Sequence, residues 1–319
     1  MPQMPLLSAA APPARNALPV AWALLIACGA AYGLLVALNR IVVAEGIPFL
    51  PYIFWQTLGA ALFLHVLCFL RRRPPPLSRA HLALYLALGI NGLALPWSIL
   101  AYVSPKIPVG VVALTFALEP MLVYAMAVGL RMDRFQWLRL FGLVCGFAGI
   151  LLIALPETSL PDPGMAVWIP LCLAAITCFS VTVILTQRMR PATGDAWSLS
   201  AGLLTVACVA LLPAMAISGE WWVFDAPFSD GEWVVLVTIP VVVLLWVQLF
   251  IVVELAGAVF FSTVAYVDML SGVAFGVLFF GERHSTYIWG ALGLLVAGLY
   301  FVNRRRPVSR PSASARSVP

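Results

Sequence analysis

Charged residues are scarce in this chain of 319 residues, since only 10% are Asp, Glu, Lys or Arg. Soluble globular domains carry about 25% charged residues, so the composition excludes a water-soluble enzyme or a nucleic-acid-binding protein despite the net charge of +5. A nucleotide-binding loop of the form GxxxxGK[ST] is also missing, and no segment outside the apolar runs is large enough for an ATPase domain. Transport driven by ATP hydrolysis within this chain is therefore excluded.

Motifs for metal ions and disulfides are lacking as well. The three histidines are scattered, and neither an HExxH motif nor a His/Cys cluster occurs. All six cysteines fall inside apolar runs and none forms a CxxC pair, which is typical of small packing residues. We therefore expect no metal site, no other cofactor and no disulfide bond.

Apolar residues are abundant, making up 63% of the chain. A helix needs about 20 mostly apolar residues to cross a bilayer, and ten stretches between Pro19 and Asn303 meet this requirement. The runs are continuously apolar, without the alternation of a lipid-facing β-strand, so they are predicted to be helices. We place them at residues 20–42, 50–70, 81–103, 107–130, 135–155, 165–187, 197–218, 231–254, 257–280 and 285–303.

The links between these spans are short, which predicts one all-α integral membrane protein with ten transmembrane helices. Only two tails, residues 1–18 and 304–319, lie outside the membrane in this interpretation. The C-terminal tail is rich in Ser, Pro and Arg and contains no apolar run. We therefore expect it to be disordered.

Positive residues are distributed unequally between the two sides of the membrane. If both termini share one side, that side holds 15 of the 18 positive residues, and only Arg40, Lys106 and Arg283 remain on the other. Because positively charged loops stay in the cytoplasm, both termini are predicted to be cytoplasmic. The 17 arginines against one lysine are typical of a GC-rich bacterial genome, so we expect a bacterial inner membrane.

The second half of the chain repeats features of the first at an offset of 149 residues. At this offset, Trp97 aligns with Trp246, Glu119 with Asp268, Asp133 with Glu282, and Gly149 with Gly298. Each half contains five spans, an odd number, so the second half must enter the membrane with opposite polarity. The loops agree, because the link after the second span is rich in arginine whereas the link after the seventh is acidic. These features predict inverted-topology repeats at residues 19–156 and 164–303.

One pattern recurs in corresponding places of the two halves. The first copy reads Leu118-Glu119-Pro120, then Asp133, then Gly142 and Gly149; the second reads Val267-Asp268-Met269, then Glu282, then Ala291 and Gly298. In this pattern the chain resembles the ten-helix EamA-type branch of the drug/metabolite transporter superfamily, over about Pro19 to Arg306. Met269, Ala291 and Gln56 depart from the family's pattern, which has proline, glycine and, in many relatives, arginine at these places.

The resemblance implies a secondary carrier that works by alternating access. The expected cargo is a small metabolite, an amino acid or a drug-like compound, with export as the expected direction and protons as candidate coupling ions. The expected assembly is a monomer or homodimer in the lipid bilayer. Such a carrier has a central cavity between its repeats. Two other interpretations use this cavity: an intramembrane enzyme or sensor, which would form product in detergent, and a partner-binding subunit, which would co-purify with a protein. The sequence offers no arrangement of nucleophile, base and metal for an enzyme.

Glu119 and Asp268 are the acids placed near the middle of predicted spans. An ionisable group there costs at least about 2.5 kcal/mol on insertion scales. Because the two acids are equivalent in the repeats, we expect them to converge near the midplane, where secondary transporters bind substrates and coupling ions. Each would carry a proton or pair with a substrate amine; the alternative is a structural role in protonated, hydrogen-bonded links between helices.

Other residues within the spans are weaker candidates. Those expected to line the cavity are Trp97, Trp246, Asn91, Gln56, Gln248 and Tyr266. Hydrogen bonding between helices is the alternative for the polar side chains, and ordinary packing is the alternative to substrate stacking for the tryptophans. The prolines expected to break or bend helices are Pro96, Pro120 and Pro240.

Two further features concern helix ends and helix packing. Asp133 and Glu282 are expected to form helix-end salt bridges, the first beside Arg131 and Arg134 and the second beside Arg283 and His284. Gly142, Gly146 and Gly149 share one helical face. Such a face permits close helix packing, with a dimer contact as one option.

Overall fold

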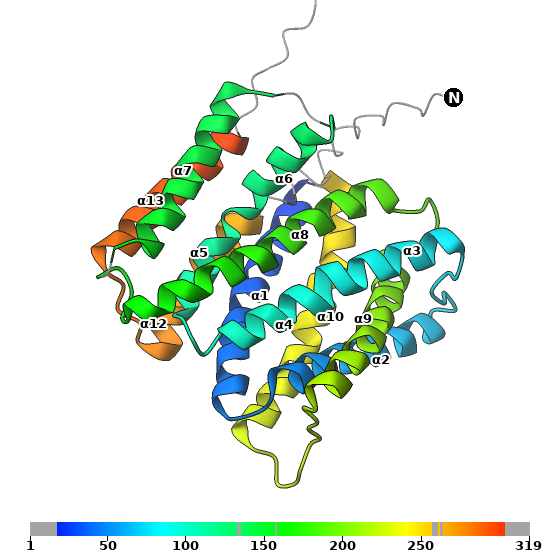
Figure 1. Ribbon diagram of the computed structural model, residues 1–319. Helices are drawn as coiled ribbons and strands as arrows, with labels where there is room; N and C mark the ends of the chain where they lie inside the picture. Colours follow the sequence, from blue (N-terminus) through cyan, green and yellow to red (C-terminus); the bar gives the residue numbers. More distant parts are fainter. Residues whose placement is uncertain (1–17, 133–134, 157, 257–260, 262–263, 304–319) are drawn as a thin grey trace, which may run out of the picture.

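The computed structural model describes residues 18–132, 135–156, 158–256, 261 and 264–303 (Figure 1). The elements assigned in this part of the chain are helices. They are α1 (Leu18–Ala44), α2 (Phe49–Leu70), α3 (Arg79–Leu88), the π-helix η1 (Gly89–Ala94), α4 (Leu95–Val103), α5 (Val109–Phe116), α6 (Glu119–Gly129), α7 (Trp137–Ala154), the 3₁₀-helix η2 (Pro163–Trp168), α8 (Ile169–Met189), α9 (Ala196–Ser218), α10 (Asp230–Ala256), α12 (Val264–Phe280) and α13 (Thr286–Asn303).

The helices form ten apolar stretches, which confirms the predicted number of spans. Eight are long and apolar enough to cross a membrane, and α12 and α13 are two shorter ones. Three spans are composite, because α3, η1 and α4 follow one another directly, as do η2 and α8, and α5 and α6 are separated by only two residues. The start of the ninth predicted span, Asp133 and, apart from Leu18, both predicted tails lie outside the described residues.

Helix packing shows the relation between the two halves. Three contacts join equivalent helices of the two repeats: α2 with α9, α5 with α12, and α7 with α13. Other contacts occur in equivalent pairs. The first helix of repeat one, α1, packs on α10 and α12, and the equivalent helix of repeat two, α8, packs on α4 and α6. Figure 1 shows the α7 and α13 pair along one edge of the molecule and the α2 and α9 pair towards another. This exchange of partners is expected of a two-fold axis and confirms two inverted five-helix repeats.

Glycines hold α7 close to α13. A Cβ atom on Gly142 would lie 2.5 Å from the carbonyl oxygen of Gly298, and one on Gly149 would lie 3.2 Å from that of Ala291. The later residue of α7, Gly149, meets the earlier residue of α13, Ala291. The two helices are therefore antiparallel, as inverted repeats require. The face with Gly142, Gly146 and Gly149 is covered by α13 and α6 of the same chain. The face does pack closely, as predicted, but the option that it forms a dimer contact is wrong.

The links between helices gather at two ends of the bundle. The basic end holds the links after α2, α6 and α8, and includes an ion pair between Arg73 and Asp195 at 3.5 Å. The opposite end holds the links after α1, α4, α7, α9 and α12, and includes a hydrogen bond from Ser285 to the carbonyl oxygen of Ser159 at 2.7 Å. The substrate path of a carrier has to connect these two ends.

Candidate substrate and coupling site

Glu119 and Asp268 lie inside the bundle on helices of different repeats. Glu119 is the first residue of α6 and is partly exposed, whereas Asp268 lies in α12 with only 2% of its surface exposed. The two acidic side chains are close enough for their charges to interact, and Cys28 and Tyr32 of α1 lie near both of them. The structure thus brings together the two acids singled out in the sequence and adds α1 to their surroundings.

Two glycines allow α1 to approach Asp268. A Cβ atom on Gly29 would lie 2.9 Å from the backbone nitrogen of Asp268, and one on Gly33 would lie 2.6 Å from that of Gly272. The Ser271 hydroxyl donates a hydrogen bond of 3.1 Å to the carbonyl oxygen of Gly29. Glycines four residues apart let membrane helices pack closely. Sequence reasoning missed this pair, although its spacing was a usable signal.

Four aromatic side chains form a closed ring near Glu119, which we call the aromatic cluster. Tyr32 stacks on Trp97 with a centroid distance of 6.0 Å, and Trp97 meets the edge of Phe179 at 5.6 Å. Phe179 stacks on Phe116 at 5.7 Å, and Phe116 lies 6.3 Å from Tyr32. The cluster draws on α1, α4 and α5 of the first repeat and on α8 of the second. Aromatic faces attract cations and apolar groups, so acids and rings together suit a substrate that carries an amine.

Two residues of the aromatic cluster, Phe116 and Phe179, lie close to Glu119. Phe116 ends α5 and Glu119 begins α6, three residues later. The hydroxyl of Ser180, next to Phe179 in α8, lies 3.4 Å from the carbonyl oxygen of Glu119. Of the four rings only Trp97 was a sequence candidate. The other three look like ordinary apolar residues and come from distant parts of the chain.

Asn91 and Trp246 both connect η1, in the third span, to helices of the second repeat. The Asn91 amide donates hydrogen bonds to the carbonyl oxygen of Cys178 at 2.7 Å and to the hydroxyl of Thr182 at 3.0 Å, and so links η1 to α8. Trp246 is buried in α10, and its ring tip lies 3.0 Å from the position of a Cβ atom on Gly92. These contacts give both side chains a clear packing function within the bundle.

Gln56, Gln248 and Tyr266 are the remaining sequence candidates. Gln56 and Gln248 are buried in α2 and α10, and the amide oxygen of each lacks a hydrogen-bond partner among the described residues. Asp268 Oδ1 shares this property within the described part of the chain. Buried polar atoms of this kind normally bind water or a ligand. Tyr266 is partly exposed on α12.

Two of the three prolines expected to break or bend helices lie in the first turn of a helix. Pro120 lies in the first turn of α6 and Pro96 in the first turn of α4, where the fixed φ angle and the missing N–H group favour a helix start. The start of α6 places Glu119 at a helix N-terminus, whose dipole favours negative charge. Pro240 lies inside α10, which continues past it as one helix, so a helix break at Pro240 does not match the structure.

Met121 connects the acid site to the α7 and α13 pair. It is two residues from Glu119, and its thioether fills the space beside two glycines. A Cβ atom on Gly146 would clash with the sulfur atom, and one on Gly298 would lie 2.8 Å from the terminal methyl group. The two glycines thus form a notch that receives Met121.

Glu282 joins three elements at the opposite end of the molecule. Its Oε1 accepts hydrogen bonds from Arg40 Nη1 at 2.7 Å and from the backbone nitrogen of Val109 at 2.6 Å, and its Oε2 accepts one from Gly110 at 3.0 Å. The carboxylate, 7% exposed, therefore ties the end of α1 to the start of α5 and the link before α13. Of the two neighbours expected beside Glu282, His284 lies near the carboxylate, but the close ion pair is with Arg40, 242 residues away.

His284 lies against the same carboxylate. Its Nε2 is 3.7 Å from Glu282 Oε2, and 2% of its side chain is exposed. Burial lowers the pKa of His284, although the negative charge of Glu282 opposes the shift. Near pH 7 the imidazole is therefore neutral, and the ionic partner of Glu282 is Arg40.

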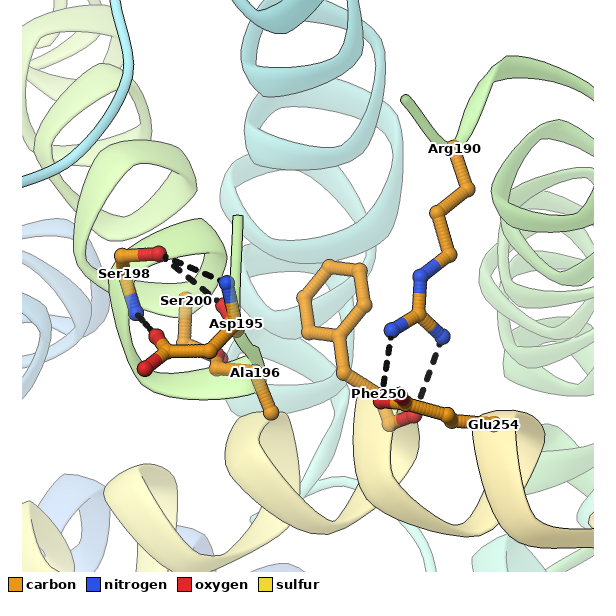
Figure 2. Close-up of polar contacts among 7 residues, drawn as sticks. All are labelled: Arg190, Asp195, Ala196, Ser198, Ser200, Phe250 and Glu254. Atoms are coloured by element: carbon orange, nitrogen blue, oxygen red, sulfur yellow. Dashed lines mark hydrogen bonds and ion pairs between the residues drawn. The ribbon is translucent and has the colours of Figure 1, made fainter. Parts of the chain in front are cut away.

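Arg190 connects α8 to α10 at the basic end (Figure 2). Its Nη2 lies 2.8 Å from Glu254 Oε2, and its Nη1 donates a hydrogen bond of 3.2 Å to the carbonyl oxygen of Phe250. Glu254 is on the last turns of α10. The bidentate contact fixes the end of α10 relative to the end of α8.

Asp195 caps α9 at the same end (Figure 2). Its Oδ1 accepts a hydrogen bond of 2.9 Å from the backbone nitrogen of Ser198, whose hydroxyl accepts one of 3.1 Å from the Asp195 nitrogen. Partial burial favours the neutral acid, but the hydrogen bonds from Ser198 and the nearby Arg71 and Arg73 outweigh it and lower the pKa of Asp195. Its carboxylate is therefore ionised at neutral pH.

Within the described residues, no group of three or more His, Cys, Asp or Glu side chains is arranged to hold a metal ion. The six cysteines are free thiols. The chemistry available at the candidate site is therefore that of carboxyl groups, aromatic faces and amides.

Comparison with known proteins identifies the architecture. The sequence pattern of the EamA-like transporter family matches the chain twice, at residues 20–155 and 166–304. No curated protein matches it. Sixteen chains of solved structures match. One of them, titled only as the crystal structure of a protein, has a TM-score of 0.58 at 17% sequence identity, covering 90% of this chain and 96% of that chain. At this identity the likeness shows the fold alone.

Proposed function

The chain belongs to the EamA-like transporter family of the drug/metabolite transporter superfamily, and we propose that it is a secondary-active exporter of the bacterial inner membrane. Its cargo in this proposal is a small metabolite, amino acid or drug-like compound that carries an amine. Protons entering the cell supply the energy, and both termini lie in the cytoplasm.

The proximity of Glu119 and Asp268 is the observation that carries this proposal. They occupy equivalent positions in two inverted repeats, and their side chains interact electrostatically between α6 and α12. Two carboxylates whose charges repel each other in a low-dielectric interior are costly to ionise together without a counterion. The pair therefore holds either a proton or a cationic substrate group, which is the exclusive choice that proton-coupled antiport requires.

The surrounding side chains support a cationic substrate. The aromatic cluster presents Tyr32 and Trp97 of the first repeat against Phe179 of the second, so an organic cation bound beside Glu119 would contact both repeats. Binding energy that differs between two arrangements of the repeats is what shifts a carrier between them.

The polar contacts of Glu282 support closure at the opposite end. The Arg40–Glu282 ion pair and the hydrogen bonds from Val109 and Gly110 connect α1, α5 and the link before α13. We propose that these contacts form when the substrate path is closed on that side and separate when it opens.

Flux measurements test the proposal. Purified protein is reconstituted in liposomes and supplied with labelled amines, amino acids and nucleosides under an imposed pH gradient. We expect gradient-driven uptake of amine-containing solutes by the native chain and its loss in Glu119→Gln.

Glu45→Gln is the matched control, since Glu45 is an exposed acid in the link after α1. The control should transport like the native protein, and both variants should elute as folded, monodisperse protein. Equal flux in Glu119→Gln and the native chain would remove Glu119 from the mechanism, and no flux with any solute would contradict the proposed activity.

A further inference from the structure

An apolar groove opens on the membrane-facing side of α2, α9 and α10. Its volume is about 510 Å³. The residues that line it include Phe63, Leu67, Trp197, Pro240, Val243 and Leu244. Phe63 is 55% exposed and Leu244 39% exposed, so in a bilayer both side chains face lipid.

The groove covers the depth of one leaflet. Phe63 and Leu67 lie in the last two turns of α2, and Trp197 lies in the first turn of α9, at the basic end. Pro240 and Val243 are near the middle of α10. From Phe63 to Arg71 the helix rises about 12 Å, which is close to the roughly 15 Å thickness of half a hydrocarbon core. The groove therefore runs from mid-membrane to the surface at the basic end.

Arginines stand at the surface end of this groove. Phe63, Leu67 and Arg71 follow one another at intervals of four residues, so they share one face of α2. The guanidinium carbon of Arg71 lies 5.6 Å from the ring centre of Trp197, which itself lines the groove. Arg72 and Arg73 follow directly, and Arg73 is 68% exposed. The negative Asp195 beside Arg73 leaves the cluster with a net positive charge.

The backbone holds the three arginines in a fixed turn. Arg72 has φ of 53°, a left-handed conformation that favours glycine over residues with a side chain. The nitrogen of Arg72 donates to the carbonyl oxygen of Phe69 at 3.0 Å, and that of Arg73 donates to Cys68 at 2.9 Å, as in a Schellman helix end. At the end of α9, the equivalent helix, the residue with a left-handed φ, 70°, is a glycine, Gly219. Arg72 therefore occupies a position whose backbone conformation favours glycine.

From the groove and the arginines together we infer that the chain binds one anionic phospholipid of the leaflet at the basic end. One acyl chain lies in the groove against Pro240 and Val243, and the headgroup phosphate pairs with Arg71 and Arg72. The apolar lining excludes a water-soluble phosphate ester as the natural occupant of the whole site. This inference does not depend on the proposed transport activity.

Binding of defined lipids to delipidated protein in detergent tests the inference. The probes are phosphatidylglycerol, phosphatidylcholine with the same acyl chains, and glycerol phosphate without chains. Native mass spectrometry counts retained lipids, and the melting temperature reports stabilisation. We expect the native chain to retain one phosphatidylglycerol in preference to phosphatidylcholine, and to gain stability from phosphatidylglycerol but not from glycerol phosphate.

Variants separate the headgroup contact from the groove. The pair Arg71→Gln and Arg72→Gln should weaken phosphatidylglycerol binding by roughly twenty-five-fold, from about fivefold for each arginine near a membrane surface, and should abolish the preference over phosphatidylcholine. Arg188→Gln, an arginine of the same end outside the groove, should change neither. Leu244→Trp should reduce binding of both lipids, whereas Val237→Trp, at a 51% exposed position of the same helix outside the groove, should not.

Three outcomes would overturn the inference. The first is equal retention of the two lipids by the native chain, and the second is equal loss of binding in Leu244→Trp and Val237→Trp. The third is that glycerol phosphate, which has no acyl chains, stabilises the protein as phosphatidylglycerol does. The native comparison needs no variant, so a variant that fails to fold leaves the test intact.

Discussion

Replacing Glu282 by glutamine probes the link between the two repeats at the opposite end. The change removes the negative charge of a side chain that is 7% exposed and receives hydrogen bonds from Arg40, Val109 and Gly110. A hydrogen bond to a charged group contributes about 1.5–3 kcal/mol, and glutamine retains one acceptor oxygen. We expect Glu282→Gln to lower the free energy of unfolding by about 3 kcal/mol.

The partner residue gives a double-mutant cycle. Arg40 is 30% exposed, so solvent screens part of its attraction, and we expect Arg40→Gln to cost about 2 kcal/mol because it leaves a buried carboxylate without its cation. In Glu282→Gln that carboxylate is absent, so the further change Arg40→Gln should cost little additional stability. The double variant should therefore cost about 3 rather than 5 kcal/mol, a coupling of about 2 kcal/mol.

Unfolding in mixed detergent micelles, followed by tryptophan fluorescence, measures the cycle. Arg283→Gln is the control, because Arg283 is exposed in the same link and forms no ion pair among the described residues; its cost should stay within about 0.5 kcal/mol. Additive effects of Arg40→Gln and Glu282→Gln, with a coupling below about 0.5 kcal/mol, would refute the assignment of Arg40 as the partner.

Two further predictions concern packing and pH. Gly142→Ala should lower stability by about 1–3 kcal/mol, because the new methyl carbon would lie 2.5 Å from the carbonyl oxygen of Gly298, whereas Gly293→Ala, which meets nothing within 4 Å, should be neutral or slightly stabilising. Equal melting temperatures for these two variants in detergent would contradict the described packing of α7 and α13. His284 has a lowered pKa in the folded chain, so the unfolded chain binds its proton first, and stability is lost as the pH falls below about 6.5. Between pH 8 and 5 the stability of His284→Gln should fall less steeply than that of the native chain; equal slopes would contradict burial of a neutral imidazole.

The sequence was sufficient for the architecture because hydrophobic length and charge asymmetry are local properties. Continuous apolar runs predicted the ten helices, and the odd number of spans in each half predicted the inverted repeat. The alignment of Glu119 with Asp268 also predicted their convergence, since a two-fold axis brings equivalent positions together. The π-helical segment η1, by contrast, carries no periodic signal that distinguishes it from the surrounding α-helix.

Long-range partners were beyond sequence reasoning for physical reasons. Charges next to Glu282 suggested Arg283, but the tertiary fold brings Arg40 to its carboxylate from the other repeat. Phe116 and Phe179 have no feature that separates them from other apolar residues until four helices place them in one cluster. Gly142 and Gly146 gave the right face but the wrong partner, because a glycine face looks the same whether another subunit or α13 covers it.

Proton release on substrate binding tests the central claim most directly. An amine identified by the flux panel is added to the purified protein in weakly buffered detergent solution, and the pH change is recorded. If Glu119 and Asp268 hold a proton and a cationic substrate alternately, the native chain releases protons on binding, and Glu119→Gln combined with Asp268→Asn releases none. Substrate binding without proton release in the native chain, or equal release in the double variant, would contradict the account.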